Sequence, residues 1–223
     1  YDEPNANENF RKLKARFPYA KRVHGVKGIA AAHFAAAKKA NTTFFYVVDA
    51  DAEILDSFMF DYIPTEFEAD YVHIWHAYNP ATGLDYGYGG VKLFSKKFFR
   101  DVPEQKDVPE QLDFSTTLAK GIKIMPEIAC ITHFNSDYIR AYRGAFREAA
   151  KLYVTANSPD KPKEQRDEAR ERLACWVEPV KNCAFRAQVQ AGARQGIYEA
   201  KRRMGNTQAL LFINDHDLLN RLF

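Results

Sequence analysis

The sequence predicts an α/β protein in which a mixed sheet is flanked by helices and followed by a helical C-terminal region. Three observations predict this class. The apolar, β-prone run at 44–48 is typical of a buried strand, and the alanine-rich segment 28–40 before it favours a helix. From Tyr138 onward, apolar residues recur at the three- and four-residue spacing of an amphipathic helix. We therefore expect two parts, residues 1–137 and residues 138–223.

The N-terminal part reads as helices alternating with strands. We expect a helix at 8–17 that Pro18 stops, and 22–26 is short enough for an edge strand or a connector. Four segments should follow the 44–48 strand: a strand at 71–77, a turn-rich loop at 79–90, a strand at 90–94 and an edge strand at 122–126. Between the last two, the peptide Asp-Val-Pro-Glu-Gln occurs at 101–105 and again at 107–111, where its prolines predict a loop, and a short helix begins at 112.

Size and composition are those of a globular protein that folds without cross-links. With 223 residues, 46% of them hydrophobic, the chain is long enough to bury roughly 70% of its unfolded surface. Cys130, Cys175 and Cys183 are odd in number and far apart, which argues against a disulfide framework or a zinc knuckle. No apolar stretch reaches the roughly eighteen residues of a membrane span, and no basic-then-apolar leader opens the sequence. We expect a cytoplasmic protein, in the host cytoplasm if a phage encodes it, with no membrane or disulfide partner.

The C-terminal part is basic and carries a line of cations. Lys plus Arg against Asp plus Glu is 16 against 19 for residues 1–137 and 16 against 10 for residues 138–223, hence −3 and +6. Such asymmetry suggests polyanionic partners. One stripe of the helix that begins at Tyr138 is basic, and it is either a solvated helix face or a contact for phosphates. This basic stripe consists of Arg140, Arg143, Arg147 and Lys151.

Two carboxylates, Asp49 and Asp51, follow the 44–48 strand one residue apart. An Asp after a strand often only begins a turn. However, continuous apolar runs are typical of central strands in α/β proteins, whose ligands collect beyond the carboxyl ends of the strands. Side chains at i and i+2 of an extended segment share a face, so both carboxylates could approach one hard divalent cation. We favour the cation site.

The strand that ends in Asp-Ala-Asp and the helix before it resemble the sugar-nucleotide half of a glycosyltransferase of the GT-A fold. The entry to the 28–40 helix holds His24, Gly25 and Lys27. Lys27 is either a solvated surface lysine or a phosphate contact beside the helix N-terminus, where anions bind well. The resemblance therefore implies a GT-A-like, Rossmann-related mixed sheet that binds a nucleotide sugar.

The same resemblance implies roles for residues further along the chain. It implies that Asp49 and Asp51 hold a divalent metal, Mn²⁺ or Mg²⁺, with His133 completing the metal shell. It also implies that the glycine-rich segment 87–90 shapes the sugar pocket and that Asp113 is the general base. On the residues alone, Asp113 could instead cap a helix, and His133 could be a core residue.

A closer resemblance is to the phage and protist DNA-base glycosyltransferases associated with TET/J-binding-protein oxygenases. It covers most of the chain, although the family pattern places a first strand before Tyr1. The stretches that carry it are Tyr1-Asp2-Glu3-Pro4-Asn5, His24-Gly25-Val26-Lys27-Gly28-Ile29, the Asp-Ala-Asp strand, Tyr88-Gly89-Gly90-Val91-Lys92-Leu93, and His133-Phe134-Asn135 with Ala141-Tyr142-Arg143-Gly144-Ala145-Phe146-Arg147-Glu148. This resemblance implies transfer of a hexose, glucose by preference, from a UDP-sugar to a hydroxymethylated pyrimidine in DNA, with inversion at the anomeric carbon.

The resemblance also divides the remaining candidate residues between donor and acceptor. The donor residues it implies are Tyr1, Asp2, His24, Gly25, Lys27, Asp49, Gly89 and Gly90. The acceptor or DNA residues are Tyr88, Lys92, Arg140, Arg143, Arg147 and Lys151. In an extended 71–77 strand, His73 and His76 lie on opposite faces, so at most one of them can face the site.

Three other functions use the same residues. The first is a glycosyltransferase that acts on a glycan, a lipid or a protein. The second is a metal-dependent nuclease or phosphotransferase, because carboxylates that hold a divalent cation also serve phosphoryl chemistry. The third is a DNA-binding module with an inactive site, which would bind DNA in a salt-dependent way without turnover.

Overall fold

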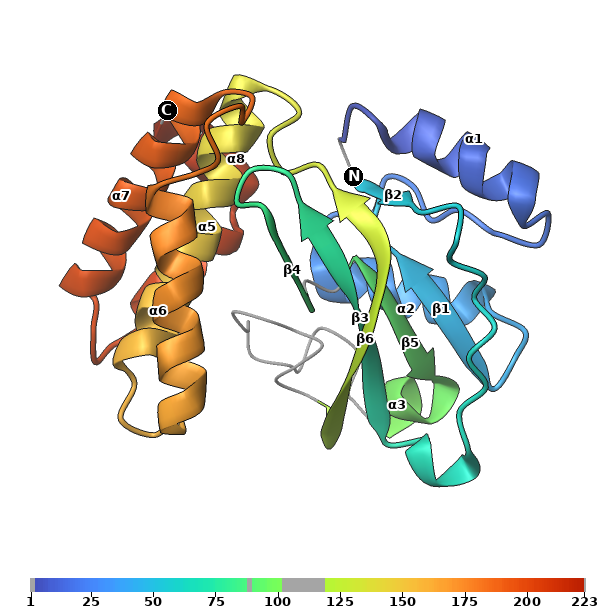
Figure 1. Cartoon of the computed structure of the whole chain (residues 1–223). Helices are drawn as coiled ribbons and strands as arrows, with labels where there is room; N and C mark the ends of the chain where they lie inside the picture. Colours follow the sequence, from blue (N-terminus) through green and yellow to red (C-terminus); the bar gives the residue numbers. More distant parts are fainter. Residues whose placement is uncertain (1–2, 88–89, 102–118, 223) are drawn as a thin grey trace. The chain divides into compact units, whose positions relative to one another are not determined.

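The computed structural model describes residues 3–87, 90–101 and 119–222 (Figure 1). The chain forms two compact units, one of residues 1–78 and 85–132 and one of residues 79–84 and 133–223. The expected mixture of helices with a mixed sheet is confirmed. The segments 107–111 and 112–118, and all but the first residue of 101–105, lie outside the described residues.

The first unit is built on a mixed sheet. Its strands run in the order β1-β5-β3-β6-β2, and β4 pairs with β3 beside this path. β3 and β6 pair in parallel, whereas β1 with β5, β5 with β3 and β2 with β6 are antiparallel. The strands are β1 (Phe44–Val48), β2 (Ala52–Ile54), β3 (Tyr71–Asn79), β4 (Leu84–Tyr86), β5 (Val91–Ser95) and β6 (Gly121–Thr132).

The position of β1 corrects the expectation of a central strand. Among the described residues β1 pairs with β5 alone and ends the sheet. Both of its faces are nevertheless covered. Phe45 packs in one cluster with Phe34 of helix α2 (Ile29–Lys39), and Tyr46 packs on the other face beside Trp75 and Phe58. The apolar run therefore reflects the burial of two faces and not the pairing of two edges.

The segment 22–26 forms a connector, one of its two expected forms. Two other expectations need correction. Strand β4 occupies part of the expected 79–90 loop. The expected edge strand at 122–126 extends to Thr132, and its last residues pair with β2. Pro126 does not end this strand, because Met125 pairs with Trp75 and Ile128 with His76, so Pro126 falls in a β-bulge.

A single carboxylate, that of Glu68, anchors the loop before β3. It accepts hydrogen bonds from Lys123 Nζ (2.7 Å), the Thr65 amide (2.7 Å) and the Tyr62 hydroxyl (2.7 Å). The Nε2 atom of the fully buried His73 lies 3.2 Å from the same group. These hydrogen bonds, that of Lys123 first, lower the pKa of Glu68 from its ordinary value. The charged form of Glu68 is therefore part of the folded state.

We predict that Glu68→Gln lowers the free energy of unfolding by about 2 kcal/mol at pH 7, because hydrogen bonds to a charged group are lost. A carboxylate with a lowered pKa stabilises the fold above its unfolded pKa, ordinarily 4.5, and loses this effect as the pH falls towards the folded-state value. The difference in free energy of unfolding between wild type and Glu68→Gln should thus narrow below pH 4.5. Urea unfolding against pH measures it, with the exposed Glu66→Gln as control. A constant difference from pH 3 to pH 8 would contradict this explanation.

Helices α1 and α3 also belong to the first unit, and helix α1 (Ala6–Arg16) is fixed along the chain that follows β1. Lys12 Nζ lies 2.6 Å from Glu53 Oε1. The Arg16 guanidinium donates to the carbonyls of Leu55, Asp56 and Phe58 at 2.8–3.0 Å. These contacts hold the 50–58 segment against a helix from the start of the chain. Helix α3 (Lys96–Asp101) follows β5.

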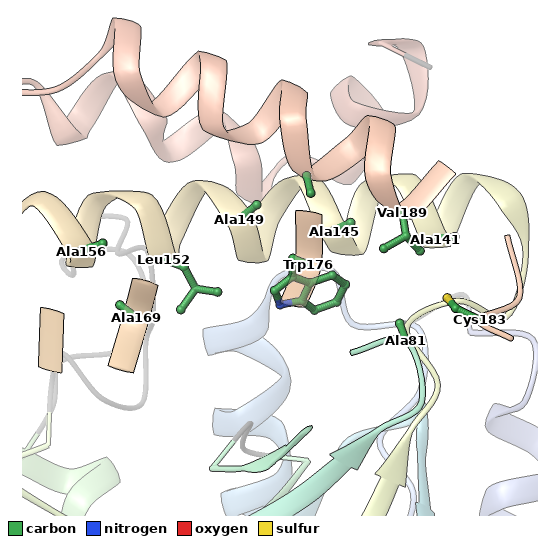
Figure 2. Close-up of a cluster of buried hydrophobic side chains, with 11 residues drawn as sticks. Ala81, Ala141, Ala145, Ala149, Leu152, Ala156, Ala169, Trp176, Cys183 and Val189 are labelled. Carbon is green, nitrogen blue, oxygen red and sulfur yellow. The ribbon is translucent and has the colours of Figure 1, made fainter. Parts of the chain in front are cut away.

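The second unit is helical, as the sequence predicts from Tyr138 onward. Trp176 lies among alanines of α5 and the side chains around them (Figure 2). The residues that connect β3 to β4 belong to this core, because Ala81 is fully buried and its carbonyl accepts from the Val180 amide at 3.0 Å. The helices are α5 (Tyr138–Asn157), α6 (Lys163–Val177), α7 (Arg186–Arg202), the 3-10 helix η2 (Thr207–Asn214) and α8 (His216–Leu222).

Two glycines set the distance between α5 and α7. A Cβ atom on Gly192 would lie 2.1 Å from the Tyr142 carbonyl oxygen, and one on Gly196 would lie 2.2 Å from that of Phe146. Backbone atoms cannot yield as a flexible side chain can. The two helices can pack at this distance only because α7 has no side chain at either position.

We predict that Gly192→Ala destabilises the protein by about 3 kcal/mol, because α7 must move away from α5 and open the packing beneath it. Gly144→Ala on α5 is the matched control, since its Cβ would lie 3.5 Å from the nearest atoms, those of Phe134. That variant should be neutral or gain up to about 1 kcal/mol from helix propensity. Equal urea midpoints for the two variants would contradict the proposed packing constraint.

Candidate active site

The two predicted carboxylates lie in a tight turn between β1 and β2. The Asp49 amide donates to the Gly90 carbonyl at 2.9 Å, and the Asp49 carbonyl accepts from the Ala52 amide at 3.1 Å. The residue between the carboxylates is also held, because Asn9 Nδ2 of α1 donates to the Ala50 carbonyl at 3.0 Å. The turn that often explains an Asp after a strand is thus present, and it fixes both carboxylates at the carboxyl end of β1.

A buried ammonium lies beside the first carboxylate. Lys92, opposite Val47 in the register of β1 and β5, is only 5% exposed, and its Nζ lies 3.4 Å from Asp49 Oδ2. Burying a charge is costly unless a partner compensates it, and Asp49 is that partner. Lys92 was predicted to contact the acceptor or DNA, but the structure places it inside the first unit, against the predicted metal ligands.

The second carboxylate has a strongly raised pKa. Burial is the main cause, the charges of Asp49 and Glu3 add to it, and together they raise the pKa of Asp51 from 3.8 to about 7. Lys92 acts in the opposite direction but does not compensate. Among the described residues, the site thus combines three carboxylates, those of Asp49, Asp51 and Glu3, with the ammonium of Lys92. A positive ligand would relieve this excess of negative charge.

The donor set fits Mg²⁺ or Mn²⁺ bound together with a phosphate ligand. In such sites the protein typically supplies one or two carboxylates, and water and substrate phosphates supply the remaining oxygens. Within the described residues, no three His, Cys, Asp or Glu side chains are grouped as a complete metal site. Asp51, and Asp49 where it is shared with Lys92, would then be the protein ligands. His133 belongs to the second unit, and its role as a third ligand stays a prediction.

Gly90, Cys130 and Thr132 pack closely together next to the turn, and none of them is reactive. A Cβ atom on Gly90 would lie 2.9 Å from Cys130 Sγ and 3.2 Å from Thr132 Oγ1, so a larger residue would displace the turn. Burial raises the pKa of the Cys130 thiol to about 12, and the charges of Asp49 and Asp51 act in the same direction. A thiol in this state is a poor nucleophile. Cys130 is therefore a packing residue beneath the carboxylates.

The structure describes some of the other residues that were predicted to bind the donor. His24, Gly25 and Lys27 are exposed on the connector that leads into α2. Since α2 and β1 are consecutive and pack together, the N-terminus of α2 points towards the carboxyl end of β1. A phosphate contact there stays a prediction. Tyr1, Asp2, Tyr88, Gly89 and Asp113 lie outside the described residues.

The basic stripe on α5 is engaged with its own unit. All four side chains are half-buried. Arg140 pairs with Asp137, which also caps the helix. Arg143 Nη1 lies 3.3 Å from Asn220 Oδ1, Arg147 Nη2 lies 3.5 Å from Asn214 Oδ1, and Lys151 Nζ lies 3.5 Å from Glu148 Oε1. These contacts account for the stripe without a ligand, and its contact with phosphates stays a prediction.

Sequence reasoning missed Asn9 and Glu3 as parts of this site. Glu3 lies within a stretch that carries the family resemblance, so a carboxylate there was available as a signal. Asn9 offered a weaker one, namely an amide in the interior of a helix, where Asn is unfavourable unless its side chain has a partner. Its partner Ala50 is 41 residues away. No local pattern predicts such a contact.

Comparisons with known proteins add no family assignment. A scan against models of protein families gave no match, and searches of curated proteins and of solved structures gave none either. In the described part of the chain, no helix is both long and apolar enough to cross a membrane. The three cysteines are free thiols.

We predict that Asp51→Asn stabilises the metal-free protein above pH 7. A carboxyl whose pKa rises from 3.8 to about 7 on folding binds its proton more tightly in the folded state, so wild-type stability falls between about pH 4 and pH 7 and is level above. The variant avoids this loss, and we expect a gain of about 2 kcal/mol at pH 8.

Urea unfolding in EDTA at pH 5 and pH 8 measures this gain. The exposed Asp61→Asn is the control, because it removes a carboxylate outside the turn. A variant no more stable than wild type at pH 8 would contradict the raised pKa. Adding Mn²⁺ should stabilise wild type at pH 8 and have little effect on Asp51→Asn, since ligands that bind the folded state stabilise it.

Proposed function

We propose that this protein is a metal-dependent glycosyltransferase that moves a hexose, glucose by preference, from a UDP-sugar to a hydroxyl group. The observation that carries the proposal is the turn at Asp49 and Asp51, held beside buried Lys92 with excess negative charge. This arrangement suits a divalent cation with a diphosphate. The family resemblance of the sequence supplies the sugar and the reaction class.

The residues of the turn would act on the leaving group. As the sugar is transferred, the nucleoside diphosphate departs with negative charge, and a divalent metal held by Asp51 and Asp49 would supply the Lewis acid that neutralises this charge. Asp51 would hold the metal, since its carboxylate lacks a full counter-charge. Lys92 would orient Asp49 and add positive potential near the departing phosphates. Because these groups are fixed before substrate binds, they need little reorganisation during the reaction.

The acceptor that we propose is the hydroxymethyl group of a modified pyrimidine in DNA. The sequence resemblance supports it, together with the +6 charge of residues 138–223. A base inside a duplex must be extruded to reach an active site, so such an enzyme needs a surface that holds DNA. Tyr88 and the basic stripe are the residues proposed for it. Asp113 is the base that the resemblance implies, and a single displacement would invert the anomeric carbon.

The test is transfer of labelled glucose from UDP-glucose, with Mn²⁺, to DNA that contains 5-hydroxymethylcytosine. Unmodified DNA of the same sequence is the acceptor control. We expect label only in the modified DNA. Asp51→Asn should lower kcat/KM at least about 100-fold and remove the dependence on Mn²⁺, because charge stabilisation of the leaving group is lost. Asp61→Asn should retain wild-type activity.

Other outcomes would identify a different function. Transfer to a glycan, lipid or protein but not to modified DNA would reject the proposed acceptor and keep the reaction class. Nicking of plain plasmid without any sugar donor would favour a nuclease. Salt-dependent DNA binding without any turnover would favour an inactive binding module.

A further inference from the structure

A second acid–base pair lies on β3 and β4 in the first unit. His76 Nδ1 is 3.7 Å from Asp85 Oδ2, a distance within ion-pair range. The Nδ1 atom is buried and makes no hydrogen bond, whereas the His76 side chain as a whole is 24% exposed. The exposed part of the ring therefore lies on its other atoms, which include Nε2.

The register of the sheet places His76 on the same face as Lys92. Ile74 pairs with Lys92, and Lys92 pairs with Val47, so these three side chains share one face. His76 lies two residues beyond Ile74. Because β3 and β5 are antiparallel, this step leads towards Gly90, whose carbonyl binds the Asp49 amide. The two pairs, Lys92 with Asp49 and His76 with Asp85, thus lie on one face near one end of the sheet.

His73 does not share this position. Its ring packs against Tyr62 and its Nε2 faces Glu68, so its position is explained by the network that anchors the loop before β3. This agrees with the expectation that the two histidines lie on opposite faces. His76 has no comparable structural network among the described residues, since Asp85 is the only charged partner recorded for it there.

We propose that His76 is the general base of the transferase, oriented by Asp85, a role that rests on the proposed function. A carboxylate at Nδ1 favours the tautomer with the proton on Nδ1, which leaves the Nε2 lone pair free to accept a proton. A carboxylate in this place also stabilises the imidazolium that forms. A contact of 3.7 Å without substrate is compatible with this role, because catalytic hydrogen bonds often shorten only when substrate binds.

The proposed step balances without any further reactant. The acceptor O–H bond breaks, and its proton moves to His76 Nε2. The acceptor oxygen forms a bond to the anomeric carbon as the bond from that carbon to the diphosphate oxygen breaks, and the diphosphate leaves with the electron pair. His76 then returns its proton to water. Asp113, the base implied by family resemblance, is the competing assignment.

The experiment measures kcat and KM for UDP-glucose and 5-hydroxymethylcytosine DNA between pH 5 and pH 9. The variants are His76→Gln, Asp85→Asn and Asp113→Asn. His76→Gln should lower kcat about 100-fold or more, in the range typical of a lost general base, with little change in the binding of UDP and Mn²⁺. Asp85→Asn should lower kcat at least about tenfold with little change in KM, because the imidazole loses the carboxylate that orients it and stabilises the imidazolium.

The outcomes distinguish failure of the proposed role of His76 from failure of the proposed transferase function. If wild type transfers glucose and His76→Gln retains kcat within about threefold, His76 is not the base and the proposed function stands. The same holds if Asp113→Asn lowers kcat about 100-fold or more while Asp85→Asn leaves kcat and KM unchanged. If wild type transfers no sugar, both proposals fail. Should His76→Gln fold poorly by circular dichroism, Asp85→Asn still tests the role, because Asp85 is half-exposed.

Discussion

The ion pair between Lys92 and Asp49 is the interaction on which the carboxyl end of β1 depends. Lys92 is almost fully buried, so its ammonium is tolerated only with a carboxylate beside it. Removing one partner of such a pair leaves an uncompensated charge, which costs more than the pair itself contributes. The same two strands are joined there by the hydrogen bond from Asp49 to Gly90. The position of the first carboxylate is therefore set by the stability of the sheet.

The second carboxylate, that of Asp51, destabilises the folded state when it is charged, in contrast to that of Asp49. Asp51 is disfavoured as an anion in the folded state, yet it lies one residue past a segment that the sheet fixes firmly. The fold tolerates this unfavourable charge because α1 holds the chain beyond β1. Asn9 donates a hydrogen bond to the Ala50 carbonyl, and Arg16 donates to three further carbonyls. Groups with strongly perturbed pKa values cluster at functional sites. A rigid turn with one unfavourable charge is what a cation-dependent site requires before its cation binds.

Sequence periodicity predicted which segments form helices and strands, but it did not predict which other elements they pair with or pack against. The 44–48 strand, the helix before it and the long helix from Tyr138 follow from local patterns, and so does the carboxylate pair. The edge position of β1 does not, because an apolar run reports covered faces. The role of Gly192 does not follow from local patterns either, because the missing side chain matters only through the contact with Tyr142 of α5. Lys92 was predicted to contact the acceptor or DNA, because the sequence alone does not tell which polar side chain of a short strand points inward.

The two faces of the sheet differ in chemistry near the turn. On the face of Trp75 lie Cys130, held as a neutral thiol, and the apolar cluster around it. On the face of Ile74 lie two acid–base pairs. Lys92 is buried and His76 is partly buried, and the carboxylate beside each of them is more exposed. Burial strengthens electrostatic interactions, while the exposed partner keeps each pair accessible to a ligand. Any reaction that this unit performs is therefore expected on the Ile74 face.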